Sequence, residues 1–250
     1  LEAKFHRDNL PPFKAVLEKW ENKKIDIPDE ATAQKLIEEI DTSPAVISDL
    51  KRSTHKLEPL PPFITSTLQQ EASKILGFSS EKTMKIAQEL YEGVDLKGER
   101  TGLVTYMRTD SLRIADEAIE NCRKLIKERF GKEFITPAPR VYKNKSTAQD
   151  AHEAIRPTNT FYTPESIAEN LSRDQLKLYT LIWQRFVATQ MKPAKLLRTK
   201  VEVTVGKAIF SANGNEVEDE AFLKVYPYMK IISGEAIDSA YEKGDNLEYG

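Results

Sequence analysis

The chain has 250 residues, of which 37 are Lys or Arg and 39 are Asp or Glu, giving a net charge of −2. This balance lacks the basic surplus of many nucleic-acid-binding domains, so any contact with nucleic acid would come from local patches. The single cysteine, Cys122, excludes an internal disulfide and a cysteine-built zinc site, and no apolar run approaches the roughly 20 residues of a membrane span. We therefore expect a soluble, cytoplasmic protein without a membrane partner.

Residues 1–61 have the pattern of strands mixed with one helix. The segments 13–20 and 45–50 are typical of strands, and residues 28–40 have the spacing of an amphipathic helix that begins at a proline. A cluster of prolines at 59–62 then interrupts this pattern, and the residues that follow have the pattern of long amphipathic helices. We place the first domain boundary after residue 61.

Residues 62–192 have the pattern of a helical domain with one short strand at 102–107. Ser66 with Gln69 predicts a capping box at the first helix, and Ser172 with Gln175 predicts another at the last. Glycines at the ends of several apolar stripes indicate where the helices stop. The predicted helices span 66–76, 80–92, 111–130, 148–156 and 172–191.

Strand patterns return in residues 193–250. Val201, Val203 and Val205 alternate with polar residues, residues 222–226 alternate again, and Asn213-Gly214 is a strong signal for a hairpin turn. The sequence therefore predicts an α+β fold. In this fold a helical domain, 62–192, is inserted into a strand-rich domain made of residues 1–61 and 193–250.

Tyr106 and Arg108 stand two residues apart in the predicted strand, so the strand period places both on one face. A phosphate could sit between them, where the guanidinium would neutralise charge that grows during attack. A phenol has an ordinary pKa of about 10, so it needs a base, a metal or a cation to react near neutral pH. Thr109, Asp110 and Ser111 could cap the next helix at an anion-binding end. Without further information, packing of Tyr106 in the strand is the simpler interpretation.

His152 and Arg156 lie four residues apart on the predicted helix 148–156 and would share a face, which offers two potential phosphate ligands. A zinc-protease signature would need His at position 156, where Arg stands, so we reject metal binding here. A local surplus of positive charge surrounds the helix. It comes from Arg140, Lys143, Lys145 and Arg156. A capped surface helix and an ordinary solvated loop are the alternative interpretations.

Three segments, in order along the chain, resemble the type IA DNA topoisomerases. Residues 61–72 (PPFITSTLQQEA) are similar to the block at the entry to the family's catalytic helical domain, and residues 102–111 (GLVTYMRTDS) to its active-site block. Residues 148–157 (AQDAHEAIRP) are similar to its histidine block. The similarity spans residues 59–230 and is closest to the bacterial topoisomerase I branch. In the family, the helical unit moves on a strand-rich arch, which would be the strand-rich domain here.

The resemblance implies roles for individual residues. Tyr106 would be the nucleophile that attacks a backbone phosphate of single-stranded DNA and holds the new 5′ end as a phosphotyrosine. Arg108 would stabilise the charged transition state, and His152 would help to position the scissile phosphate. Resealing from this intermediate would relax negatively supercoiled DNA. The further expected DNA-binding residues are Asp110, Ser111, Arg113, Lys145 and Arg156.

The resemblance also implies that part of the active site lies outside this chain. Family members carry an amino-terminal module whose acidic residues and lysine complete the site, and no such acidic strand motif precedes residue 60. We therefore expect a central fragment that contains no metal ligands of its own. Its Mg²⁺ ligands would lie in the missing amino-terminal module, and further domains would follow downstream. We expect that the fragment alone neither cleaves nor relaxes DNA.

Two other interpretations use the same residues. In a non-catalytic single-stranded DNA-binding module, Tyr106 would stack on a base and the basic residues would follow the backbone. A site-specific recombinase would also form a phosphotyrosine, but its Arg and His residues precede the tyrosine. Here His152 and Arg156 follow Tyr106, so the order argues against a recombinase.

Overall fold

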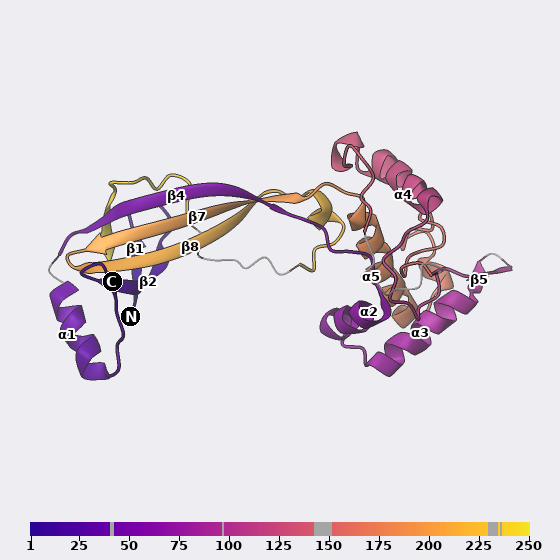
Figure 1. Cartoon of the computed structure of the whole chain (residues 1–250), viewed down its shortest axis with the longest axis horizontal. Coiled ribbons are helices and arrows are strands. Elements are labelled where there is room, and N and C mark those ends of the chain that lie inside the picture. The colour runs from indigo at the N-terminus through magenta and orange to yellow at the C-terminus, as the bar shows by residue number, and fades with distance from the viewer. Residues whose placement is uncertain (41–42, 97, 143–151, 230–234, 236) are drawn as a thin grey trace. The chain divides into compact units, whose positions relative to one another are not determined.

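The computed structural model describes residues 1–40, 43–96, 98–142, 152–229, 235 and 237–250. They form two compact units (Figure 1). A strand-rich unit contains residues 1–57, 195–219 and the described part of 230–250, and a mostly helical unit contains residues 58–194 and 220–229. The α+β fold class predicted from the sequence is confirmed. No helix among the described residues is both long enough and apolar enough to cross a bilayer.

The strand-rich unit is built on a sheet that closes on itself (Figure 1). The strand order is β1-β9-β4-β7-β8-β2-β3, and β1 also pairs with β2, so six strands form a closed barrel and β3 extends from β2. Closure gives backbone partners to strands that would otherwise be exposed edges. The strands are β1 Glu2–His6, β2 Phe13–Trp20, β3 Lys23–Lys24, β4 Ala45–Leu57, β7 Ala194–Val205, β8 Ala208–Asp219 and β9 Asn246–Tyr249.

Alternating apolar side chains fill the barrel. Every second residue of β2 from Phe13 to Leu17 is buried, and so are the three alternating valines of β7, which confirms the predicted strand pattern. Phe5 contacts three further rings, with its centroid 5.9 Å from that of Phe13, 5.3 Å from that of Phe210 and 5.8 Å from that of Tyr249. Helix α1, Glu30–Ile40, also predicted from the sequence, adds its apolar face to this core. Each large apolar side chain buried here stabilises the fold by about 1.5–3 kcal/mol.

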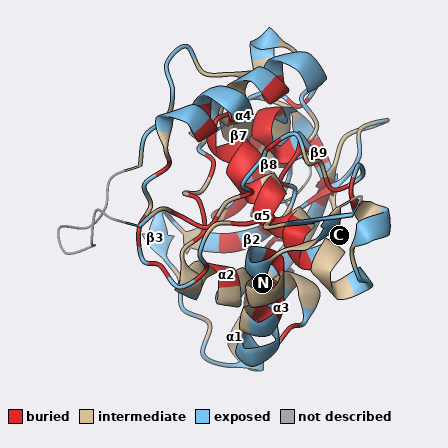
Figure 2. Cartoon of the chain, turned by 90° about the vertical axis from the view of Figure 1, so that its right-hand side faces the viewer, coloured by how far each residue is buried: buried red, intermediate tan, exposed pale blue. Residues whose placement is uncertain are grey.

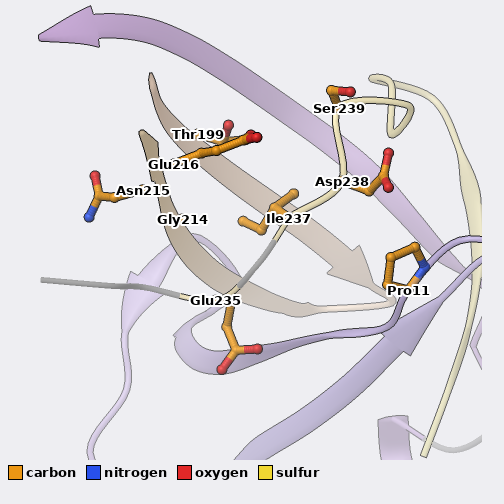
Figure 3. A pocket seen from close by; sticks show the side chains of 9 residues that line it. All are labelled: Pro11, Thr199, Gly214, Asn215, Glu216, Glu235, Ile237, Asp238 and Ser239. Carbon is orange, nitrogen blue, oxygen red and sulfur yellow. The ribbon is translucent and has the colours of Figure 1, made fainter. Parts of the chain in front are cut away.

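The turn between β7 and β8 does not lie at Asn213-Gly214, as predicted, but at Gly206, whose φ of +57° is the left-handed conformation that tight turns favour. Gly214 instead pairs with Thr199 inside the hairpin. Its missing side chain admits another segment, because a Cβ atom there would lie 2.5 Å from the Glu235 carbonyl oxygen. Figure 3 shows Glu235 beside this strand. The glycine therefore marks a close backbone approach and not a chain reversal.

The helical unit is organised around α5, Arg173–Thr189, which is mostly buried from Leu178 onward (Figure 2). Its predicted capping box is confirmed: the Ser172 hydroxyl accepts from the Gln175 amide at 3.3 Å, and the Gln175 side chain accepts from the Ser172 amide at 2.9 Å. The predicted limits of α3 are confirmed as well. The other elements are α2 Thr65–Glu71, the π-helix Ala72–Leu76, α3 Ser80–Glu92, β5 Val94–Leu96, β6 Glu99–Thr101, α4 Asp116–Arg129, and the 3₁₀ helices Lys132–Phe134, Ala168–Asn170 and Ala221–Lys224.

Three features of this unit differ from the sequence prediction. Helix α2 begins without the Ser66–Gln69 capping box, and the Thr67 hydroxyl instead accepts from the Ile64 amide at 3.0 Å. Helix α4 begins at Asp116, five residues later than predicted at 111. Residues 222–226, predicted as a strand of the flanking domain, belong to the helical unit and begin within a 3₁₀ helix. Their apolar side chains are buried here, as they would be in a strand, so the sequence pattern alone could not distinguish a 3₁₀ helix from a strand.

A buried cation, Arg185, connects the segments of the helical unit and is only 4% exposed. Its Nε donates to the Pro61 carbonyl at 2.6 Å, its Nη1 donates to the Tyr226 hydroxyl at 2.9 Å, and its guanidinium lies 4.6 Å from the Phe63 ring centroid. The Tyr226 hydroxyl donates in turn to Glu71 at 3.0 Å, and burial raises the pKa of this tyrosine. Because an unpaired buried charge is costly, these contacts tie the Tyr226 segment into the unit.

We predict that Gly214→Ala destabilises the strand-rich unit by about 1–3 kcal/mol, because the added methyl group overlaps the Glu235 carbonyl and overpacking has costs of this size. Urea unfolding measures the change. Gly250→Ala is the control, since nothing lies within 4 Å of a Cβ atom added there. The control should change stability by less than about 0.5 kcal/mol. An unchanged midpoint for Gly214→Ala would show that the neighbouring segment yields without cost.

Candidate active site

Three extended segments of the helical unit, around Phe63, Thr105 and Ile155, are joined by backbone hydrogen bonds. The Ile155 amide donates to the Phe63 carbonyl at 2.8 Å, and the Thr105 amide donates to the Arg156 carbonyl at 2.9 Å. These are the same three segments that the sequence singled out. Residues far apart along the chain thus meet in one place.

Two threonine hydroxyls strengthen this pairing on either side of Tyr106. Thr105 Oγ1 donates to the Ala154 carbonyl at 2.7 Å and accepts from the Arg156 amide at 3.0 Å. Thr65 Oγ1 donates to the Met107 carbonyl at 2.7 Å and accepts from the Thr109 amide at 2.9 Å. The backbone is therefore fixed both before and after the tyrosine. The sequence did not identify either threonine as part of the site.

The segment 102–107 is extended but is not the regular strand that was predicted, because its only ladder contact with another described residue is an isolated bridge between Val104 and Pro157. Burial nevertheless alternates from residue 106 onward. Tyr106 is 40% exposed, Arg108 and Asp110 are exposed, and the residues between them are buried. The phenol of Tyr106 is thus open to solvent and is not part of the hydrophobic core.

The ring of Tyr106 lies between two other aromatic rings. Its centroid is 5.4 Å from that of Tyr91 in an edge-on arrangement, and 6.4 Å from that of His152 at an interplanar angle of 35°. Tyr91 and His152 are themselves exposed. The structure thus brings together Tyr106 and His152, which the sequence placed in the same site from separate motifs. Within the described residues the Tyr106 hydroxyl makes no hydrogen bond, so it is free to meet a ligand.

Tyr91 was missed by the sequence reasoning, because its contact with Tyr106 depends on how the chain returns to α3. The Leu103 amide donates to the Leu90 carbonyl at 2.8 Å. A Cβ atom on Gly102 would lie 2.7 Å from the Tyr91 carbonyl oxygen. Only a glycine allows this approach without a shift of the backbone. The pairing of a glycine with a tyrosine eleven positions earlier has no local sequence signal.

The predicted helix 148–156 is wrong for residues 152–156, which are extended. Their amides bond to other segments, and a residue before proline, here Arg156, disfavours the helical conformation. The Arg156 Nη2 and Nε donate to Glu153 Oε2 at 2.5 and 3.1 Å, and its Nη1 donates to the Pro157 carbonyl at 3.0 Å. With a side chain only 11% exposed, Arg156 acts as a structural ion pair in this conformation and not as a free phosphate ligand.

The remaining predicted DNA-binding residues have different surroundings. Arg108 is exposed and makes no ion pair with any described residue. Arg113 is exposed and lies 4.0 Å from Glu153. Ser111 is fully buried and its hydroxyl accepts from the Arg113 amide at 3.2 Å, so the prediction that Ser111 contacts DNA is not supported by this conformation. It also does not cap α4, which begins further along. Lys145 and the predicted helical residues 148–151 lie outside the described residues.

The donor set of this site does not fit a metal ion. Among the described residues no group of three or more His, Cys, Asp or Glu side chains is arranged to hold one. The carboxylate of Glu153, the residue after His152, already bonds to Arg156. We therefore assign no step at this site to a metal held by these residues.

Comparisons with known proteins identify the family of the chain. A family model described as DNA topoisomerase matches residues 1–250. The DNA topoisomerase 1 of Campylobacter jejuni is 47% identical over 204 residues, covering 81% of this chain and 29% of the relative. The DNA topoisomerase 1 of Treponema pallidum is 42% identical over 240 residues, covering 96% of this chain and 32% of the relative. The structure of full-length topoisomerase I from Thermotoga maritima is similar over 100% of this chain and 39% of that one, with a TM-score of 0.77 and 37% identity.

The chain therefore belongs to the DNA topoisomerase family. Its similar relatives are bacterial topoisomerases I, the branch of the type IA enzymes that the three sequence blocks resemble. The chain spans less than a third of the length of these curated relatives.

We predict that Thr105→Val lowers the stability of the helical unit by about 1–3 kcal/mol, because it leaves the Ala154 carbonyl and the Arg156 amide without their partner. Urea unfolding monitored by the fluorescence of Trp183 measures the loss. Thr101→Val is the matched control, since the Thr101 hydroxyl makes only a 3.4 Å bond to the exposed Glu99 carbonyl. The control should change stability by less than about 0.5 kcal/mol. Equal effects of both variants would contradict a bridging role for Thr105.

Proposed function

We propose that this chain carries the nucleophile with which a type IA topoisomerase cleaves and rejoins one DNA strand. The observation that carries the proposal is the exposed Tyr106 phenol, held between two rings on a backbone that Thr65 and Thr105 fix on either side. In the forward step a bond forms between the Tyr106 oxygen and phosphorus while the bond from phosphorus to the 3′ oxygen breaks. The phenol gives up its proton, and the departing oxygen becomes a 3′ hydroxyl.

The reverse of this exchange reseals the strand. The 3′ hydroxyl attacks the phosphotyrosine and releases the phenol, so the energy of the phosphodiester is retained and no ATP is needed. Passage of DNA through the transient break would relax negative supercoils. The proposed partners are single-stranded DNA and the unpaired regions of negatively supercoiled DNA.

Arg108 is proposed to bind the scissile phosphate. Its guanidinium is exposed and has no ion pair among the described residues, so binding an anion breaks no existing contact. A charge-assisted hydrogen bond to the phosphate would strengthen as negative charge grows there. His152, whose ring lies beside Tyr106, is proposed to position the same phosphate. Arg113 and the exposed Asp110 are proposed to contribute to the surrounding DNA interface.

Magnesium is proposed to act through ligands outside this chain, because the described residues do not offer a suitable donor set. The chain by itself should therefore bind single-stranded DNA but not relax a negatively supercoiled plasmid in magnesium buffer. Agarose-gel electrophoresis of the plasmid measures relaxation. The matched control is a protein that also contains the proposed amino-terminal module. Relaxation by the isolated chain would show that the catalytic groups are complete within it.

The tyrosine is tested by Tyr106→Phe in the full-length enzyme. We predict that this variant forms no covalent DNA adduct on a denaturing gel, while its affinity for a single-stranded oligonucleotide changes less than about threefold, because the ring and its two neighbours remain. Tyr91→Phe is the control, since it removes a hydroxyl one ring away. The alternative function, a non-catalytic module in which Tyr106 stacks on a base, predicts that Phe is tolerated in every assay and that no adduct forms with the unaltered protein.

A further inference from the structure

A polar groove lies along α2 and the π-helix that follows it. Its lining residues share exposed or half-exposed positions and polar side chains. They are Ser66, Gln69, Gln70, Ser73, Lys74 and Ser80. The first four follow the spacing i, i+3, i+4, i+7 that places side chains on one helix face. The other face buries Leu68 and Ala72. One side of this helix therefore packs in the core while the other presents only hydroxyls, amides and an ammonium group.

These groove side chains have unused hydrogen-bonding capacity. Within the described residues, the side chains of Ser66, Gln69, Gln70 and Ser73 make no hydrogen bond, whereas the Lys74 ammonium lies 3.6 Å from Glu71. That carboxylate also accepts a hydrogen bond from Tyr226. No acidic side chain is among the described residues that line the groove itself. Hydroxyl, amide and lysine side chains are among the groups that contact DNA phosphates and sugars.

The groove begins directly beside the candidate active site. Thr65, the residue before Ser66, bonds through its hydroxyl to Met107 and Thr109, the two neighbours of Arg108. The groove therefore starts one residue from the contact that fixes the Arg108 backbone. It then continues along the π-helix, a conformation that is rare and concentrated at functional sites. Ser80, the first residue of α3, completes its lining.

We propose that this groove binds the sugar-phosphate backbone of the DNA strand next to the phosphate that Tyr106 attacks. The position of the bound strand relative to the cleavage site rests on the proposed function. Binding of single-stranded DNA in the groove does not depend on cleavage. Because the lining groups would contact backbone and not base edges, the groove would hold the strand without regard to sequence. At a rise of about 1.5 Å per residue, the face from Ser66 to Lys74 extends about 12 Å along the helix.

Fluorescence anisotropy with a labelled single-stranded oligonucleotide tests the groove in the full-length enzyme. The triple variant Gln69→Ala, Gln70→Ala, Ser73→Ala should bind more weakly, by about fivefold for each hydrogen bond lost. Lys74→Ala should also reduce the slope of log affinity against log salt by about 0.7, the value for one phosphate contact on a single strand. The controls are Asn121→Ala and Lys127→Ala, which remove an exposed side-chain amide and an exposed ammonium group on α4 and should leave affinity and slope unchanged. Unfolding midpoints equal to the parent's exclude loss of structure.

The position of the groove is tested with oligonucleotides in which one phosphate near the cut is replaced by an uncharged methylphosphonate. At one position the replacement should weaken binding by the unaltered enzyme and have no further effect on Lys74→Ala. The same cost at every position in both proteins, or an equal loss in the α4 controls, would overturn the proposal. Tyr106→Phe separates the two hypotheses. If the groove substitutions still weaken binding in the Tyr106→Phe background but the unaltered enzyme forms no covalent adduct, only the assignment of the nucleophile is contradicted. If the unaltered enzyme forms the adduct but the groove substitutions leave binding unchanged, only the groove proposal is contradicted.

Discussion

The geometry of the candidate site depends on the hydroxyl of Thr105, which links two chain segments 49 residues apart in the sequence. By bonding to the carbonyl of Ala154 and the amide of Arg156, it fixes the backbone beside Tyr106 to the segment that carries His152. The Tyr106 ring can therefore be exposed while its position is defined. In the proposed role of nucleophile, Tyr106 would need little reorganisation when a substrate arrives, which is a source of catalytic efficiency in preorganised sites.

The three arginines of the site are in different electrostatic situations. Arg156 is committed to Glu153, and Arg113 approaches the same carboxylate at 4.0 Å. Arg108 has no such counter-ion among the described residues. Glu153 thus lies close to both Arg156 and Arg113. Arg108, two residues after Tyr106, remains available to an anion. Charge that is paired within the fold supports structure, and charge that is not paired is free for recognition.

Features governed by neighbouring residues were predictable from the sequence, and features governed by distant ones were not. The caps of α3 and α5 and the alternation in β7 depend on local spacing and were confirmed. The strand conformation of Gly214 and the extended 152–156 segment depend on hydrogen bonds and close contacts with remote backbone, so local signals misassigned both. In the site, the sequence placed Tyr106 with His152, and the observed ring contact agrees. It missed Tyr91 because that contact arises only once Gly102 passes along α3.

The closed barrel has a consequence for the order of folding. Its strands β1, β2 and β4 precede the helical unit in the chain, whereas β7 and β8 follow its main part, residues 58–194, and β9 also follows its last part, residues 220–229. During synthesis β1 and β2 can pair with each other, but β4 emerges before both of its partners, β7 and β9, so the barrel cannot close until the last strand has been made. Pairings between such distant segments form slowly because the intervening loop loses entropy when it closes. Much of the helical unit can become compact during this delay, and the nascent barrel halves are the part of the chain most dependent on chaperone protection.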